Sequence, residues 1–146
     1  MKIKRIEHIA IAVDSLDGMA KMLGDKFGIA LEYTEDRPTT RLAMMPVGET
    51  YIELLQGTSP DSGATKWLAE KGQSLFHICF EVEDIDEALA ELKAKGTPLL
   101  NETPIIGHGN CRIAFVDPKA TGNILFELAE MPRDGDSHGD GAAAAH

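Results

Sequence analysis

Apolar and polar residues follow two different periods in the first part of the chain. Residues 3–13 are rich in apolar and β-branched side chains on both sides of His8, which predicts a strand. A helix is expected next, with Ser15 or Asp14 as its cap. Its apolar residues recur at helical spacing and predict one buried face made of Leu16, Ala20, Leu23 and Phe27. Further strands are expected at 30–35, 40–46 and 50–56, so the order is β-α-β-β-β.

The same order of elements recurs after a segment rich in turn residues. Residues 57–63 (GTSPDSG) are typical of a linker, and residues 64–71 predict a short helix that ends at Gly72. A strand is expected at 75–83. A helix capped by Asp84 and closed by Gly96 follows, and its predicted buried face consists of Ile85, Ala88, Leu89 and Leu92. The last three strands are expected near 97–102, 111–117 and 123–130.

Each half of the chain carries one His and one Glu at matching places. IEHIAIAV contains His8 and LFHICFEV contains His77, while YIELL contains Glu53 and LFELAE contains Glu127. A carboxylate on a strand that faces a core is costly to bury without a partner. Duplication can bring two His and two Glu to one pseudo-twofold axis, so the sequence predicts a metal site. Imidazole with carboxylate suits divalent Co, Ni, Zn, Mn or Fe, and the residue types do not choose among them.

The repeat and the length indicate one domain. We expect a single domain at 1–130, with module one at 3–56, a linker and short helix at 57–72, and module two at 75–130. From Met131 the composition becomes polar and Gly-rich (PRDGDSHGDGAAAAH). Residues 131–146 are therefore predicted to form a disordered tail.

The charge of the chain argues against several classes of partner. The net charge is −10, which argues against nucleic acid and anionic membranes but leaves room for an anionic small molecule in a locally basic groove. Cys79 and Cys111 are isolated and lie in apolar runs, so we expect small buried core residues in a reducing, cytoplasmic protein. Neither a signal-peptide pattern nor an apolar stretch of membrane-spanning length is visible.

Four segments together resemble the methylmalonyl-CoA epimerase family of the vicinal oxygen chelate superfamily. They are HIAIAV at 8–13, DSGATKWLAEKG at 61–72, FHICFEVEDI at 76–85 and NETPIIGHGNCRIAFVDPKATGNILFEL at 101–128. The resemblance covers about residues 3–130. It implies an α+β fold in which two paired βαβββ modules form a cupped mixed sheet around a metal. It also implies an isomerase of propionate metabolism, a divalent metal such as cobalt, and a homodimer.

The resemblance further implies a ligand set and a reaction. The metal ligands would be His8, Glu53, His77 and Glu127, and the enzyme would interconvert (2R)- and (2S)-methylmalonyl-CoA by removing the C2 proton to give a metal-stabilised enolate. Glu127 would be one base. Glu53 is the candidate for the other, with a water molecule on the metal as its rival.

Three positions depart from the family pattern. Phe76 replaces a His that is not a ligand, and Asp117 replaces another His. Leu42 stands where some members carry a free Glu, and leucine cannot move a proton, so the identity of the second base is open.

Several residues are candidates for holding an acyl-CoA. Lys119 matches a Lys of the family, and Lys66, Arg112 and the backbone amides around Gly107 are weaker candidates. The alternative for each cation is an ordinary solvated charge. His108 is a candidate third proton-transfer residue, with an exposed turn histidine as the alternative.

Other functions within the superfamily remain open. Glyoxalase I also uses a His-Glu-His-Glu set. This chain is similar to it in having a Glu at position 53 and no free Glu at position 42, where Leu42 stands. Another isomerase of the superfamily is a further alternative. A ring-cleaving dioxygenase would need only two His and one Glu on iron. A non-catalytic ligand-binding member would need no metal, so metal content separates it from the enzymes.

Overall fold

The structure is a computed structural model, and it describes residues 1–133. Most of the predicted tail, from residue 134 on, lies outside the described residues. The described chain divides into two compact units: one comprises residues 8–76, and the other comprises residues 1–7 together with those from 77 on. The boundaries fall inside strands β1 (Ile3–Ala12) and β5 (Ser74–Val82), so each of these strands contributes residues to both units.

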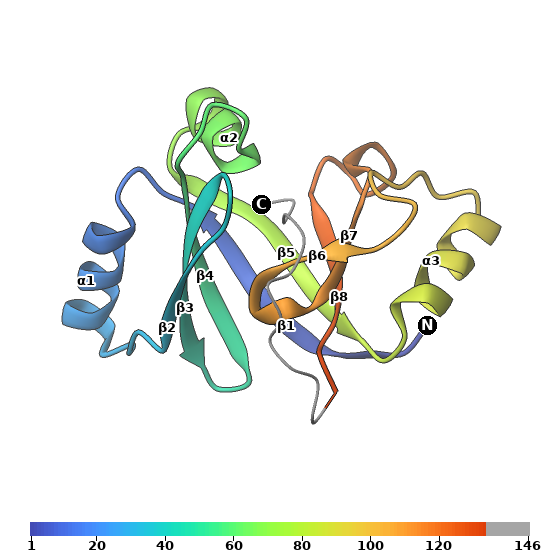
Figure 1. Cartoon of the computed structure of the whole chain (residues 1–146), viewed down its shortest axis with the longest axis horizontal. Helices are drawn as coiled ribbons and strands as arrows, with labels where there is room; N and C mark the ends of the chain where they lie inside the picture. The colour runs from blue at the N-terminus through green and yellow to red at the C-terminus, as the bar shows by residue number, and fades with distance from the viewer. Residues whose placement is uncertain (134–146) are drawn as a thin grey trace. The chain divides into compact units, whose positions relative to one another are not determined.

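The unit of residues 8–76 combines parallel and antiparallel strands. Strands β2 (Tyr33–Asp36), β3 (Thr40–Val47) and β4 (Thr50–Gly57) form an antiparallel meander, and β1 pairs with β4 in parallel (Figure 1). A parallel partner requires a crossover, and helix α1 (Leu16–Phe27) is part of it. In the β1–β4 register, His8 lies opposite Tyr51 and Ala10 lies opposite Glu53.

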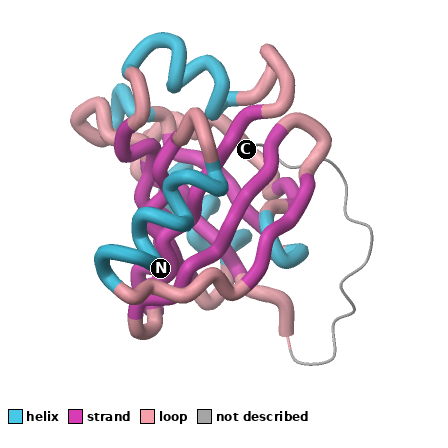
Figure 2. The backbone as a smooth tube through the Cα atoms, turned by 90° about the vertical axis from the view of Figure 1, so that its left-hand side faces the viewer, coloured by secondary structure: helices cyan, strands magenta, loops and turns pink. Residues whose placement is uncertain are grey.

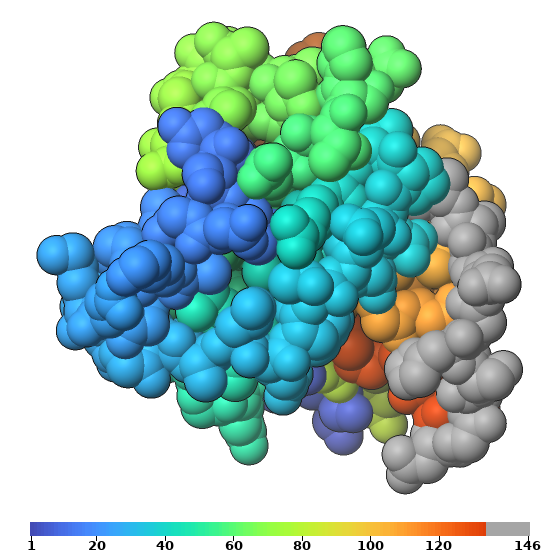
Figure 3. Space-filling view, turned by 60° about the vertical axis from the view of Figure 1, so that its left-hand side comes forward, coloured from blue at the N-terminus to red at the C-terminus, as the bar shows by residue number. Residues whose placement is uncertain are grey.

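Helix α1 is capped at both ends and packs by one face. The Ser15 side chain accepts a hydrogen bond from the Gly18 amide, and Gly28 ends the helix in the left-handed conformation with φ 70°. Leu16 and Leu23 join a buried cluster with residues of β3 and β4, while α1 also contributes to the surface of this unit (Figure 3).

The prediction that Phe27 belongs to this buried face is wrong. Phe27 is 69% exposed. The chain reverses at Gly28, and the Ile29 amide returns to the Leu23 carbonyl, so Ile29 packs against the cluster instead.

Helix α2 (Gly63–Lys71) is fixed to the same unit by polar and aromatic contacts. Ser62 caps the helix, and its hydroxyl lies 2.8 Å from the hydroxyl of Thr40 on β3. Trp67 stacks on Phe76 with ring centroids 5.2 Å apart, and its indole N–H donates to the Ser74 hydroxyl. The helix predicted at 64–71 is thus confirmed as Gly63–Lys71, and Figure 2 draws the backbone of the helices in cyan.

The other unit repeats this order of elements. Strand β5 pairs in parallel with β8 (Phe126–Glu130), and β7 (Arg112–Val116) is antiparallel to both β8 and β6 (Ile105–Ile106). Helix α3 (Ile85–Ala94) contributes Ile85, Ala88 and Leu89 to a cluster with Ala114 and Leu128. Gly96 follows the helix with φ 73°, as expected for the residue that closes it.

Residues 1–7 are attached to this second unit. The amino terminus of Met1 lies 2.9 Å from the Glu91 carboxylate, and the Glu83 amide donates to the Lys2 carbonyl. Arg5 Nε lies 2.7 Å from Glu81, a carboxylate that also pairs with Lys4. Opposite charges therefore hold the start of β1 against β5 and α3.

The strand predicted at 97–102 does not form. This segment makes only an isolated bridge, between Leu99 and Val116. Pro98 has no N–H to donate, and the Asn101 side chain, rather than a backbone carbonyl, accepts the hydrogen bond of the Phe115 amide. The strand instead appears later, as β6.

Both halves thus have the order β-α-β-β-β, and the predicted α+β class with mixed strands is confirmed. In the part of the chain that the structure describes, every helix is too short or too polar to cross a membrane.

A matched pair of substitutions on α1 tests this packing. Leu16 is 1% exposed and Phe27 is 69% exposed. We expect Leu16→Ala to lower the free energy of unfolding by about 3 kcal/mol, because it leaves a cavity in the core. Phe27→Ala should change it by less than about 0.5 kcal/mol. Urea denaturation followed by circular dichroism measures both values, and equal losses would contradict the assignment of the buried face.

Candidate functional site

His8 and Glu53 form a buried pair in the unit of residues 8–76. Glu53 lies opposite Ala10 in the β1–β4 register, and His8, two residues before Ala10, points to the same face. Its Nε2 atom lies 3.4 Å from Oε1 of Glu53, and both side chains are 0% exposed. Parallel pairing of the first and last strands of the module thus brings together two of the predicted ligands.

His77 and Glu127 form the corresponding pair in the other unit. Glu127 lies opposite Cys79 in the β5–β8 register, and His77 stands two residues before Cys79. Its Nε2 atom lies 3.4 Å from Oε2 of Glu127, again with both side chains 0% exposed. The His77 ring meets Phe115 edge-on at 5.3 Å between centroids. The second pair therefore repeats the construction of the first.

The donor atoms of each pair fit a divalent metal ion. A fully buried carboxylate needs a compensating charge, which a protonated imidazole or a cation can supply. Imidazole nitrogen and carboxylate oxygen are the ligands that divalent Co, Ni, Zn and Mn accept in proteins. Each unit thus supplies one nitrogen and one oxygen donor of the predicted ligand set.

A second His–Glu pair lies in the unit that contains residues 1–7. His108 belongs to the short 3-10 helix η1 (His108–Asn110), and its Nε2 atom lies 3.1 and 3.2 Å from the two carboxylate oxygens of Glu7. Both side chains are buried. His108 is therefore not an exposed turn residue.

The loop that carries His108 has little room to change. The Gly107 amide donates to the Cys111 carbonyl, and a Cβ atom on Gly107 would come within 2.9 Å of Ile113. Gly109 has φ 58°, in the left-handed region. This part of the predicted substrate site is thus a tight turn tied to β1 through Glu7.

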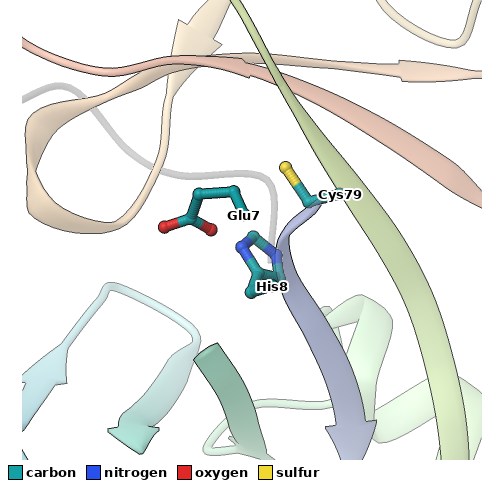
Figure 4. Close-up of side chains that lie close together, drawn as sticks. All are labelled: Glu7, His8 and Cys79. Atoms are coloured by element: carbon teal, nitrogen blue, oxygen red, sulfur yellow. The ribbon is translucent and has the colours of Figure 1, made fainter. Parts of the chain in front are cut away.

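The neighbourhood of Cys79 was not evident from the sequence. Cys79 and Cys111 are free and buried, as expected of core residues. The Cys79 sulfur, however, lies 3.9 Å from the Phe80 carbonyl oxygen, to which the thiol donates, and Cys79 stands opposite Glu127 in the β5–β8 register. Burial, followed by the charges of Glu127 and Glu7, raises the pKa of the Cys79 thiol well above its ordinary value. Figure 4 shows Cys79 on β5 and Glu7 on β1.

Among the predicted acyl-CoA contacts, Arg112 is already engaged in ion pairs. Its two terminal nitrogens each lie 3.0 Å from the Asp86 carboxylate, and Nη1 also lies 3.3 Å from Glu130. The hydrogen bond from Arg112 lowers the pKa of Asp86, and the same contact raises the pKa of Arg112. Arg112 borders a cavity of about 540 Å³ that Asn110 and Arg133 also line.

Lys119 and Lys66 are exposed. Lys119 lies in the 3-10 helix η2 (Pro118–Ala120), whose first turn is capped by the Asp117 carboxylate, and Lys66 lies on α2. Leu42 is 0% exposed and packs with Met44 and Leu55 in an apolar cluster. The position where some epimerases carry a free Glu is therefore part of the hydrophobic core.

Comparison with known proteins agrees with this geometry. The family model for the Glyoxalase/Bleomycin resistance protein/Dioxygenase superfamily matches residues 7–115. An uncharacterized protein of Bacillus subtilis is 31% identical, over 93% of this chain and 97% of its own length. An ethylmalonyl-CoA/methylmalonyl-CoA epimerase of Cereibacter sphaeroides is 31% identical, over 88% of this chain and 99% of its own.

A solved structure extends the likeness to three dimensions. It is that of a substituted methylmalonyl-CoA epimerase of Streptomyces coelicolor in complex with 2-nitronate-propionyl-CoA. It superposes with a TM-score of 0.85 at 33% identity, and the alignment covers 89% of this chain and 96% of that one. The likeness therefore spans nearly all of both chains.

The buried Glu7–His108 pair can be tested by a double-mutant cycle. We expect Glu7→Gln and His108→Gln each to destabilise the protein, because each leaves a buried polar partner without its match. The double variant should lose less than the sum, with a coupling energy of about 1 kcal/mol or more. Chemical denaturation gives the three values.

The exposed ion pair between Lys21 and Asp25 on α1 provides the control. The same cycle on that pair should give a coupling energy of at most about 0.5 kcal/mol, because water screens exposed charges. Additive losses at Glu7 and His108 would contradict the pairing.

Proposed function

Because the chain belongs to the Glyoxalase/Bleomycin resistance protein/Dioxygenase superfamily, we propose that it is a metal-dependent methylmalonyl-CoA epimerase. Such an isomerase interconverts the 2R and 2S forms of methylmalonyl-CoA. One observation carries the proposal: each unit holds a buried His–Glu pair with the same 3.4 Å separation. Relatives of about 31–33% identity, aligned over most of their length, are epimerases of this substrate class.

The proposed metal ligands are His8, Glu53, His77 and Glu127. Their support is the donor chemistry of each pair and the membership of the family. A divalent ion held by these groups would stabilise the negative charge that develops on the substrate when C2 loses its proton. This donor set suits divalent cobalt, nickel, zinc or manganese.

Proton transfer at C2 is assigned to carboxylates of the chain. The C2 proton lies between a thioester and a carboxylate, so its removal gives an enolate. Glu127 accepts this proton on one face of the substrate, and Glu53, from the other module, serves the opposite face. A change of configuration is simplest with one base on each face. Leu42 cannot take either role, because its side chain is apolar and buried.

The remaining groups are assigned to the acyl-CoA. Lys119 and Lys66 are exposed cations suited to phosphate groups, and the turn at Gly107 and His108 is proposed to lie at the substrate. Arg112 can contribute its charge only in competition with Asp86 and Glu130. We further propose a homodimer, as the family resemblance implies, and a cytoplasmic location, which suits two free buried cysteines.

Proton exchange at C2 tests the proposal directly. We expect cobalt-loaded protein in D2O to remove the C2 proton signal of methylmalonyl-CoA in proton NMR, together with appearance of the other epimer. Glu127→Gln should slow this at least about 100-fold, the scale on which one acid–base group contributes. Leu42→Ala serves as the control, because it changes a buried residue without removing a possible base. It should lower the stability of the protein and leave the rate of C2 proton exchange unchanged.

No exchange by protein that has bound metal would exclude the epimerase. The hemithioacetal of methylglyoxal and glutathione would then be the next substrate, because a buried Leu42 and a Glu at position 53 also suit glyoxalase I.

Metal binding gives a separate prediction. We expect about one divalent ion per chain by mass spectrometry after dialysis against cobalt, and near-complete loss in His8→Ala and His77→Ala, because each removes a ligand. Added cobalt should raise the melting temperature of the unsubstituted protein but not of these variants. Glu81→Gln is the control: Glu81 is a buried carboxylate on the strand that carries His77, but it pairs with Arg5 and Lys4. Equal metal content in all four proteins would contradict the ligand assignment.

A further inference from the structure

The two helices of the unit of residues 8–76 pack on opposite faces of its strands. Leu54 belongs to the buried cluster under α1, whereas Leu55 belongs to a cluster with Ala64 of α2. Leu55 stands two residues after Glu53 on β4 and therefore points to the same face as that carboxylate. Helix α2 thus lies on the face that carries a proposed metal ligand.

The end of strand β2 directs an arginine to the same face. Residues of β2 are alternately half-buried and exposed, and Glu35 is one of the half-buried ones. Glu35 lies opposite Leu42, and Leu42 lies opposite Leu55, so these three side chains share one face. The side chain of Arg37 is only 11% exposed, and its Nη1 atom lies 3.2 Å from Oε2 of Glu35. The guanidinium group is therefore held on the side of the sheet that carries Glu53.

The turn that contains Arg37 is tied to the beginning of α2. The Arg37 amide donates to the Thr40 carbonyl, and the Thr40 hydroxyl lies 2.8 Å from the hydroxyl of Ser62, the residue that caps α2. Lys66 lies in the first turn of this helix, where its amide donates to the Ser62 carbonyl. Two cations from separate segments are thus held near the N-terminus of α2, whose dipole adds positive potential.

We propose that Arg37 binds the phosphate groups of the acyl-CoA. This inference rests on the proposed function. A guanidinium presents five N–H donors in a planar fork that matches phosphate oxygens, and a single carboxylate such as Glu35 cannot use all of them. A chain of net charge −10 repels a ligand with several negative charges, so a local cation has to hold the phosphates.

The position of Arg37 on the sheet decides which part of the ligand it contacts. Tyr33 is in register with Met44, and Met44 is in register with Glu53, two strands away from β2. Arg37 stands four residues beyond Tyr33. With about 4.8 Å between strands and about 3.3 Å per residue, the Cα atoms of Arg37 and Glu53 are about 16 Å apart along the sheet. Arg37 therefore suits the phosphate-bearing end of the ligand rather than the carbon that loses its proton.

Substrates with and without phosphates test this assignment. We expect Arg37→Met to raise the KM for methylmalonyl-CoA about 10-fold or more, because charge-assisted hydrogen bonds to phosphate are lost. The kcat should stay unchanged, as for the loss of a contact made equally in ground state and transition state. With methylmalonyl-pantetheine, which has no phosphate, the variant and the unsubstituted protein should have the same kcat/KM. A merely damaged fold would lower kcat/KM for both substrates.

Two further variants separate the contact from charge and from damage. Arg41, on the same hairpin, is 40% exposed and contacts Asp36 and Asp17 at 3.8 Å. Arg41→Met removes the same charge from the opposite face, and it should leave the KM unchanged. Arg37→Lys keeps the charge without the fork, so its KM should be intermediate. An equal rise in KM for Arg41→Met and Arg37→Met, or no rise in Arg37→Met, would overturn the inference.

Binding of CoA alone keeps this inference apart from the proposed reaction. Isothermal titration calorimetry compares the affinity of the unsubstituted protein and of Arg37→Met for CoA, and it needs no turnover. Binding about 10-fold or more weaker in the variant supports the phosphate contact even if C2 proton exchange is absent, in which case only the proposed reaction fails. Equal affinity in the two proteins, or no binding of CoA to the unsubstituted protein, overturns the inference whatever the activity.

Discussion

Burial of a carboxylate beside an imidazole is the constraint around which each unit of this chain is arranged. Glu53 and Glu127 are both 0% exposed, and each has a His nitrogen 3.4 Å away. An isolated charge at such depth is too costly to keep, so the partner must be held reliably in place. In both units the two residues come from the first and last strands of a module, paired in parallel. Parallel neighbours cannot be joined by a hairpin, which accounts for the crossover through α1 or α3 and the antiparallel strands that follow.

The same constraint extends to the other internal carboxylates of the second unit. Glu7 is bonded to His108, and Glu81 is bonded to Arg5 and Lys4. Residues 1–7 supply a partner in each of these contacts, which explains why they belong to this unit although they precede the first module in sequence. An acidic chain of net charge −10 thus keeps its buried carboxylates compensated one by one. This pairing, together with the packing of Met1 against the apolar cluster around Val82 and Leu89, ties the start of β1 to its unit.

Much of this arrangement could be predicted from the sequence, because it follows from local patterns and from the repeat. The helical spacing of Leu16 and Leu23 and the glycines at 28 and 96 predict helices that the structure confirms. The repeat places one His and one Glu at matching positions of each half, and in the structure His8 lies 3.4 Å from Glu53 and His77 lies 3.4 Å from Glu127. The failures involve contacts that no local pattern encodes. Phe27 has the right spacing for burial but is exposed, because the chain reverses direction directly after it. Residues 97–102 do not form a strand, because Pro98 has no N–H to donate and the Asn101 side chain accepts the hydrogen bond of the Phe115 amide.

The differences between the modules carry the functional information that the repeat alone cannot. A duplicated site would by itself treat both faces of a substrate alike. Here, however, Glu7 precedes His8 whereas Phe76 precedes His77. Likewise, Ala10 lies opposite Glu53 whereas Cys79 lies opposite Glu127. Such asymmetry cannot change the equilibrium between two epimers, which the substrate alone determines. It can change which proton transfer limits the rate in each direction. An enzyme of this proposed kind therefore has no thermodynamic reason to keep its two carboxylates equivalent, and each can be tuned through its neighbours while the shared metal chemistry is retained.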